Sequence, residues 1–171
     1  MPASIDPLRG ALAEFDGRAV TLLSEAAVQF ESDKHYLKHL VILAQDPEDN
    51  ISSGATWLIK THLEAGGDLC ASETSRLLER LDAIRDWQAQ LHICQSIQFL
   101  TPDNDAAEQT RLWLAPLLAH KRPFLRAWAL DAICHLASLF PVHQGEATRA
   151  LEIALCDPAA SVRARARNLA S

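Results

Sequence analysis

The stretch KRPFLRAWALDAICHLASLF, from Lys121 to Phe140, carries the pattern that decides the fold. Written as a helix, it places Pro123 in the first turn, where the missing backbone N–H of proline costs nothing. One face of this helix then carries only apolar or small side chains, namely Leu125, Ala129, Ala132, Ile133 and Leu136. Small side chains on a helix face allow a neighbour to approach closely, so the stretch predicts a tightly packed helix.

The spacing of this apolar face recurs along the chain. Three of its positions return 37 residues later, and copies of them also occur 38 and 74 residues earlier. In chain order the four sets are Ile51, Ala55 and Leu58; Trp87, Leu91 and Cys94; Leu125, Ala129 and Ala132; and Val162, Ala166 and Leu169. Four copies at a period near 37 residues indicate a repeat architecture.

A second apolar series alternates with the first. Its members are Leu40, Leu78, Leu114 and Leu151, at separations of 38, 36 and 37 residues. The repeating unit is therefore a pair of helices. Because one pair cannot bury its apolar faces alone, successive pairs are expected to stack into an α-solenoid. This arrangement predicts that the four leucines lie in the core beside Ile51, Trp87, Leu125 and Val162.

Composition and helix signals support an all-α fold. Leu and Ala dominate, the chain has 6 glycines, and no stretch alternates β-branched with polar residues. At 171 residues and 49% hydrophobic content the chain is long enough for one domain with a continuous core. Start and stop signals predict helices over residues 5–15, 18–30, 34–45, 46–63, 72–84, 86–100, 101–120, 121–140, 142–156 and 157–170. Pro116 predicts a kink near Leu112 or an early helix end around Ala115.

Three segments resemble the HEAT-repeat family of armadillo-like α-solenoids. That family favours an Asp-Pro start, a Val-Arg pair and a small residue one turn later. The matching residues are Asp46-Pro47 with Ile51 and Ala55, Leu125-Arg126 with Ala129, and Asp157-Pro158 with Val162-Arg163 and Ala166. The resemblance covers roughly residues 34–171. The family includes scaffolds, adaptors, lyases and nucleic-acid enzymes, so it does not by itself select a function.

The resemblance implies one HEAT-like domain over residues 1–171. Residues 1–33 would form a divergent N-terminal cap, 34–156 the repeats, and 157–171 a C-terminal capping helix, because each end of a solenoid must face water. In resembling repeats the Arg of the Val-Arg pair binds acidic turn residues of a neighbouring repeat. We expect this role for Arg126 and Arg163.

Net charge and targeting signals indicate which partners and which location to expect. The net charge of −6 disfavours general nucleic-acid binding, although residues from Lys121 onward hold 7 basic and 4 acidic side chains. The segment from Met1 to Gly10 lacks the basic and apolar regions of a secretory signal, and no stretch reads as membrane-spanning. The sequence therefore predicts a cytoplasmic protein that does not bind membranes.

The search for catalytic motifs is largely negative. The sequence contains no G-x-S-x-G, no glycine-rich phosphate loop, no H-E-x-x-H and no calcium loop. His35 and His39 could share a helix face, but Lys34 and Lys38 beside them would repel a cation. The four cysteines show no zinc-ligand spacing and are interpreted as buried free thiols. These patterns predict no catalytic residue, no metal and no cofactor.

Two enzymatic alternatives stay open. Trp128 and Asp131 near Arg126 are similar to the Trp, Asp and Arg that HEAT-like DNA glycosylases use on a concave basic face, which would make the protein a DNA-binding or DNA-repair protein. A lyase-type HEAT-repeat enzyme is suggested by the family resemblance alone. It would require a deep polar pocket with His or Asp.

Function is expected on the concave face of the solenoid. In resembling solenoids the second helix of each pair lines that face, so positions two residues from each core leucine point into a groove. The candidates are Lys38, Ile42, Arg76, Arg80, Leu112, Arg149 and Ile153, with Gln109 and Trp113 at the flank. Their mixture of basic and apolar side chains predicts a protein–protein interaction scaffold that holds an amphipathic or acidic segment of another protein. A solvated helix face with scattered apolar residues is the simpler alternative.

Overall fold

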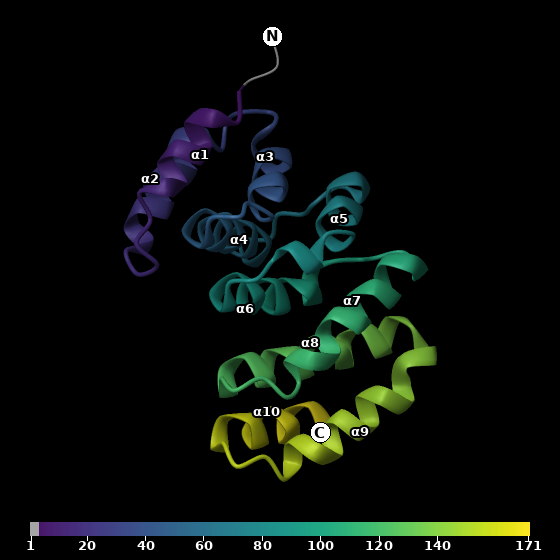
Figure 1. The fold of residues 1–171 in the computed structure, drawn as a ribbon. Helices are drawn as coiled ribbons and strands as arrows, with labels where there is room; N and C mark the ends of the chain where they lie inside the picture. The colour runs from purple at the N-terminus through teal and green to yellow at the C-terminus, as the bar shows by residue number, and fades with distance from the viewer. Residues whose placement is uncertain (1–3) are drawn as a thin grey trace. The chain divides into compact units, whose positions relative to one another are not determined.

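A computed structural model describes residues 4–171 and is all-helical over them (Figure 1). No β-strand occurs in this part of the chain. The α-helices are α1 (Asp6–Ala13), α2 (Val20–Phe30), α3 (Tyr36–Leu43), α4 (Asp49–Glu64), α5 (Ala71–Leu78), α6 (Trp87–Ser96), α7 (Asn104–Leu117), α8 (Pro123–Leu139), α9 (Gln144–Leu155) and α10 (Ala160–Ala170). Short 3₁₀ turns lie at η1 (Leu81–Ala83), η2 (Ile97–Phe99) and η3 (Pro141–His143). The prediction of an all-α fold is confirmed.

The chain divides into two compact units, one ending at Thr101 and the other beginning at Pro102. The first unit contains α1 to α6, and the second contains α7 to α10. Whether the two form the single solenoid domain that the sequence predicts stays a prediction.

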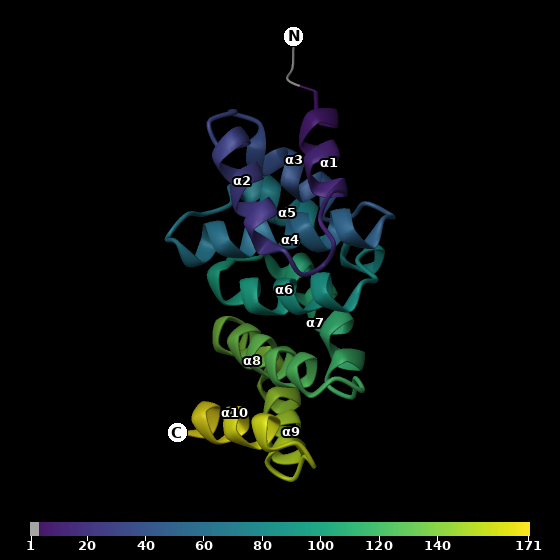
Figure 2. The same ribbon diagram turned by 90° about the vertical axis from the view of Figure 1, so that its left-hand side faces the viewer.

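In the first unit α4 is the central helix. It contacts α1, α2, α3 and α6. Gly54 lies where α1 and α2 approach α4 most closely, since a Cβ atom there would sit 3.0 Å from Leu23 and 3.3 Å from Leu12. Figure 2 shows α2 lying across α4. Two side-chain amides also tie the N-terminal hairpin down: Asn50 donates to the carbonyl of Ala13 and Gln88 to that of Gly17.

In the second unit α8 is the central helix. It contacts α7, α9 and α10. Pro123 is its first residue, as its fixed φ favours. The apolar face predicted for this helix is buried throughout, at Leu125, Ala129, Ala132, Ile133 and Leu136. This part of the sequence prediction is confirmed.

Two of the three predicted core positions of α6 are wrong, because the buried side chains lie two residues after Trp87 and Leu91, whereas Cys94 is buried as predicted. Trp87 and Leu91 are only partly buried, whereas Ala89 and Ile93 are fully buried. At the start of this helix the Asp86 carboxylate accepts hydrogen bonds from the backbone N–H groups of the second and third helical residues, and the buried face packs against α4. The third residues of α4, α6, α8 and α10 are Ile51, Ala89, Leu125 and Val162, and all four are buried.

The predicted leucine series is buried at three of its four members. Leu40, Leu78 and Leu114 are buried, but Leu151 is only partly buried. On α9 the fully enclosed side chains are those of Ala147 and Ala154. Leu151 therefore lies at the margin of the core rather than inside it.

Helix α5 ends earlier than its sequence signals predict. It is capped at Cys70, whose backbone N–H donates to the Glu73 carboxylate, instead of at Ser72. It stops at Leu78, and Arg80 precedes the turn η1 with non-helical backbone angles of φ −124 and ψ 26. Arg80 therefore does not occupy the helical position from which its orientation was deduced.

Helix α7 begins later than predicted, and it ends at Leu117, between the two predicted ends at Ala115 and His120. Asp103 caps it by accepting from the backbone N–H of Ala106, so Thr101-Pro102 is not the start pair. Pro116 lies within the last turn and the helix continues to Leu117. A proline so close to the end removes only one hydrogen bond of the ladder, and the early end at Ala115 is therefore wrong.

Arginine side chains hold the Asp-Pro turns. Arg126 on α8 binds both carboxylate oxygens of Asp157 at 2.7 and 2.8 Å, as predicted for this Arg. Arg163 instead donates to the backbone carbonyls of Asp157 and Pro158. In the first unit Arg9 binds Asp46 in the same bidentate manner. Such paired bonds are geometrically specific, so they align the turn with the preceding helix.

Replacing Asp157 with asparagine is expected to destabilise the second unit by about 1–2 kcal/mol, because the bidentate bond with Arg126 loses its charge and one acceptor. Urea unfolding followed by circular dichroism measures the change. The matched control is Glu152→Gln on α9, an exposed carboxylate that is expected to change stability by less than about 0.5 kcal/mol. Equal effects of the two substitutions would contradict a stabilising role for the Arg126–Asp157 pair.

Candidate functional site

The candidate groove residues lie in both units. Lys38 and Ile42 are on α3, Arg76 is on α5, and Arg80 follows α5 in the connection to η1. In the second unit Gln109, Leu112 and Trp113 are on α7, and Arg149 and Ile153 are on α9. Exposed side chains in this set are Lys38, Arg76, Arg80, Gln109, Leu112, Arg149 and Ile153, whereas Ile42 and Trp113 are partly buried.

In the second unit, helices α7 and α9 are joined by an ion pair and border a common cavity. Arg111 on α7 donates to the Glu146 carboxylate on α9 at 2.7 Å, and Arg149 borders the same surface cavity as Arg111. Ala119 near the end of α7 and Ile153 on α9 line a second, smaller cavity. We call the exposed or half-exposed residues Gln109, Leu112, Trp113, Arg149 and Ile153 the α7–α9 surface.

The α7–α9 surface combines apolar and basic side chains. Leu112 is 57% exposed and Ile153 is 74% exposed, so both side chains are accessible to a ligand. Arg149 is exposed and has no ion-pair partner in the described part of the chain. The arrangement can therefore bury apolar side chains and pair with a carboxylate on the same ligand.

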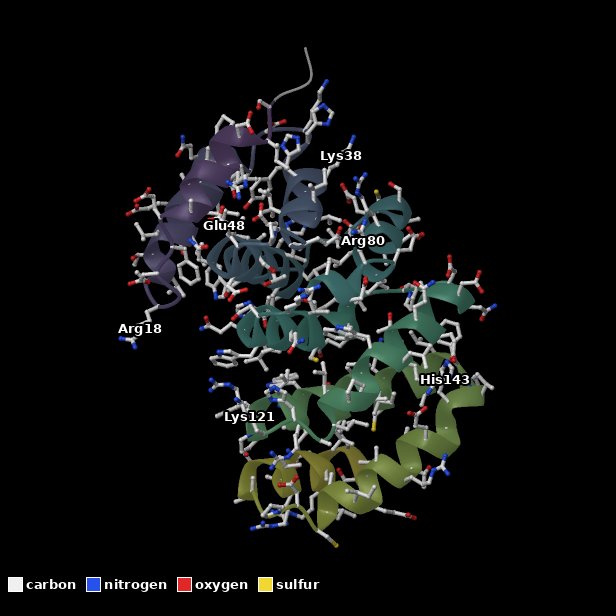
Figure 3. All side chains as sticks on the ribbon, viewed as in Figure 1. Arg18, Lys38, Glu48, Arg80, Lys121 and His143 are labelled. Atoms are coloured by element: carbon white, nitrogen blue, oxygen red, sulfur yellow. The ribbon has the colours of Figure 1, made fainter. Side chains whose placement is uncertain are left out.

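The candidates of the first unit are mainly basic. Helices α3 and α5 contact each other, and the Gln45 side chain donates to the backbone carbonyl of Arg76 at 3.0 Å. Lys38 and Arg80 can be followed in Figure 3. Neither these two side chains nor that of Arg76 forms an ion pair among residues 4–171. They offer positive charge to a ligand, but the only apolar candidate beside them, Ile42, is partly buried.

A charged network supports the second unit beside the α7–α9 surface. Arg111 binds Glu108 as well as Glu146, and its hydrogen bonds hold the pKa of Glu108 below the ordinary value. His143, labelled in Figure 3, is buried with its Nδ1 3.9 Å from the Glu108 carboxylate. The network fixes α7 and α9 relative to each other, because Arg111 bridges both helices.

A second polar cluster lies between α4 and α6 in the first unit. The Thr56 hydroxyl is 3.1 Å from Nδ1 of His92, and it also donates to the backbone carbonyl of Ser52 or Ser53. Burial, together with the charge of Lys60, lowers the pKa of His92 to about 4. His92 is therefore neutral near pH 7. The sequence does not indicate the Thr56–His92 pair, because the two residues are 36 positions apart and neither belongs to a motif.

The aromatic and acidic pair suggested for DNA-repair chemistry is held by a different arginine. Arg165 on α10 lies over the Trp128 ring, 4.1 Å from its centroid, and donates to the Asp131 carboxylate at 3.1 Å. Arg126 binds Asp157 instead. The prediction that Arg126 accompanies Trp128 and Asp131 is thus wrong, since positions two residues apart on a helix face different directions.

The cysteines are not all buried. Cys94 is buried and burial raises the pKa of its thiol, but Cys70 and Cys156 are exposed and Cys134 is partly buried. Cys70 lies at the start of α5, where its Sγ is 3.1 Å from the Ser72 hydroxyl. The interpretation of all four as buried small hydrophobic residues is therefore wrong for the two exposed ones.

Comparison with protein-family models, with curated proteins and with solved structures gave no match. Among residues 4–171, no helix is both long and apolar enough to cross a membrane. The same residues contain no group of three or more His, Cys, Asp or Glu side chains arranged to hold a metal ion.

Proposed function

We propose that the protein is a non-enzymatic interaction scaffold of the HEAT-like α-solenoid type, which binds an amphipathic, acidic segment of a partner protein. The observation that carries the proposal is the α7–α9 surface, where exposed Leu112 and Ile153 accompany the unpaired Arg149 on two adjacent helices. A cytoplasmic location is part of the same proposal.

The regular spacing of buried residues supports this proposal. Helices α4, α6, α8 and α10 bury their third residues, and these are separated by 38, 36 and 37 residues. In a solenoid, stacked helix pairs create extended surfaces on which neighbouring helices present equivalent positions. Leu112 and Arg149 are such positions, because they are 37 residues apart on α7 and α9.

The chemistry of the surface selects the partner. An amphipathic helix places apolar side chains three or four residues apart, which suits two separate anchors such as Leu112 and Ile153. A carboxylate beside those anchors would pair with the exposed Arg149. The partner is therefore expected to be acidic as well as amphipathic.

The double substitution Arg149→Glu with Leu112→Asp is expected to abolish capture of the partner, because it reverses the charge and removes an apolar anchor. Affinity capture from native cell extract, followed by mass spectrometry, should recover a protein with the wild type that the variant does not retain. Photo-crosslinking from a benzoylphenylalanine placed at position 112 should then map to an acidic amphipathic segment of that protein.

A matched control keeps the experiment specific. Phe124→Asp with Arg167→Glu makes the same kinds of change at exposed positions on α8 and α10, and it should leave capture unchanged. Thermal unfolding of both variants should stay close to that of the wild type. Undiminished capture by the Arg149→Glu, Leu112→Asp variant would refute the proposal, as would crosslinks to a basic or unstructured polar segment.

A second candidate function is a HEAT-like DNA-binding or DNA-repair protein. The contact of Arg165 with both Trp128 and Asp131 favours this candidate, because HEAT-like DNA glycosylases use the same three residue types, Trp, Asp and Arg. Exposed Phe124 lies one helical turn before Trp128 and could add a stacking surface for a base. Fluorescence anisotropy with duplex and single-stranded DNA tests this candidate. Binding that is lost in Trp128→Ala and falls with added salt would support it over the scaffold.

A further inference from the structure

A surface cavity of about 780 Å³ opens in the first unit among α2, α3, α4 and the start of α5. This volume lies within the range of small-molecule sites. The side chains that give it chemical character are Glu31, Lys34, Tyr36, Trp57, His62 and Glu73. All of them belong to the first unit, so the cavity is separate from the α7–α9 surface.

Two aromatic side chains in this cavity carry polar groups without partners. Tyr36 is only 7% exposed, yet its hydroxyl forms no hydrogen bond within residues 4–171. The indole N–H of Trp57 likewise has no acceptor among the described residues. The Tyr36 hydroxyl is not itself a fully buried atom, so it can bond with water or with a ligand in the cavity.

The charge around the cavity is predominantly negative. Glu31, Asp33 and Glu73 line it against the single ammonium group of Lys34. Asp33 and Glu73 each accept from a backbone N–H, of His35 and Cys70 respectively, whereas the Glu31 carboxylate has no partner in the described part of the chain. Burial and the charge of Glu31 raise the pKa of Tyr36 to about 12, so the phenol stays neutral and Glu31 lies close enough to influence it.

His62 forms part of the cavity wall beside Trp57, and its ring packs against Gly67. A Cβ atom at residue 67 would therefore require the ring to move. The imidazole Nε2 is 3.2 Å from the Asp68 carbonyl, which holds the ring in place. The cavity thus has a built wall, because the same turn that ends α4 fixes the position of His62.

We propose that this cavity binds a small organic cation through its alkylammonium group, with Tyr36 and Trp57 providing aromatic surfaces and Glu31 the countercharge. Aromatic rings attract cations through their electron-rich faces, and a neighbouring carboxylate adds Coulomb attraction. A primary ammonium would also donate to the unpaired Tyr36 hydroxyl, whereas a quaternary one would use only the rings and the charge. The same alkylammonium chemistry is offered by a free amine and by a lysine side chain of a peptide.

The test uses choline and its neutral isostere 3,3-dimethylbutan-1-ol, which differ in charge but hardly in shape. The readout is the indole N–H resonance of Trp57 in ¹H–¹⁵N spectra of the full chain at constant ionic strength, assigned with Trp57→Phe. Choline is expected to shift this resonance saturably, with an affinity roughly 2- to 30-fold higher than that of the isostere. Nα-acetyl-lysine methylamide forms a second arm, and tighter binding of this compound than of choline would identify the peptide side chain as the source.

Matched variants separate the cation site from nonspecific attraction. Glu31→Gln is expected to weaken choline binding several-fold, while Glu25→Gln, an exposed carboxylate on the helix α2 that ends just before Glu31, lies outside the cavity and should leave binding unchanged. Tyr36→Phe should weaken the lysine derivative but not choline. The proposal is overturned by equal affinities for choline and its isostere, by a Glu31→Gln variant that binds as the wild type does, or by the absence of a saturable Trp57 shift at millimolar choline. None of these outcomes bears on partner capture at the α7–α9 surface.

Discussion

Replacing Leu114 with alanine is expected to lower the free energy of unfolding by about 2–5 kcal/mol. Leu114 is 0% exposed and lies on the face of α7 that packs against α8. Its truncation removes apolar contacts and leaves a cavity that neighbouring helices can fill only partly. Urea unfolding, followed by far-ultraviolet circular dichroism, measures the loss as a lower transition midpoint.

The control for this prediction lies two residues away on the same helix. Leu112→Ala removes the same atoms from a side chain that is 57% exposed, and it should change stability by less than about 0.5 kcal/mol. The pair also tests the proposed binding surface, since Leu112→Ala should weaken partner capture without affecting folding. A loss below about half a kcal/mol for Leu114→Ala would show that this face of α7 is not in the core.

Lowering the pH from about 6.5 to about 4 is expected to destabilise the first unit by up to about 3 kcal/mol through His92 alone. The unfolded chain binds a proton on this side chain near its ordinary pKa of 6.5, whereas in the folded chain the pKa is about 4. The stabilising contribution is therefore complete above pH 6.5 and is lost as the pH falls toward 4. Desolvation is the main cause, and the charge of Lys60 adds to it.

The measurement compares urea midpoints of the wild type and His92→Gln across this pH range. Glutamine can still bond with the Thr56 hydroxyl but cannot titrate, so its stability should fall less steeply with acid. His120 provides a control, because its imidazole is near the surface and its pKa is lowered mainly by mild desolvation and by Lys121 and Arg122. His120→Gln should therefore change the slope less than His92→Gln. Parallel pH profiles for wild type and His92→Gln would contradict the prediction.

The candidate site could be predicted only in part. Counting from the core leucines placed Leu112, Arg149 and Ile153 at positions that are exposed in the structure, because α7 and α9 are regular helices around those residues. The same counting does not apply to Arg80. Helix α5 ends at Leu78, so the direction of the Arg80 side chain does not follow from the helical period. The cavity of the first unit was not predicted at all. Trp57 belongs to no sequence motif. Its place in a cavity depends on how α2 and α3 pack around α4, which the sequence pattern does not specify.

The sequence by itself determined the helical class and the buried face of α8, and the resemblance to HEAT repeats indicated that Arg126 binds an acidic turn residue. The first two features follow from local chemistry, namely apolar side chains at helical spacing and proline in a first turn. Tertiary structure alone decided which side chains of α6 are buried, the close approach of α1 and α2 at Gly54, and the marginal position of Leu151. Each of these depends on how far a neighbouring helix can approach, and that distance is set by side chains distant in the chain rather than by the local pattern.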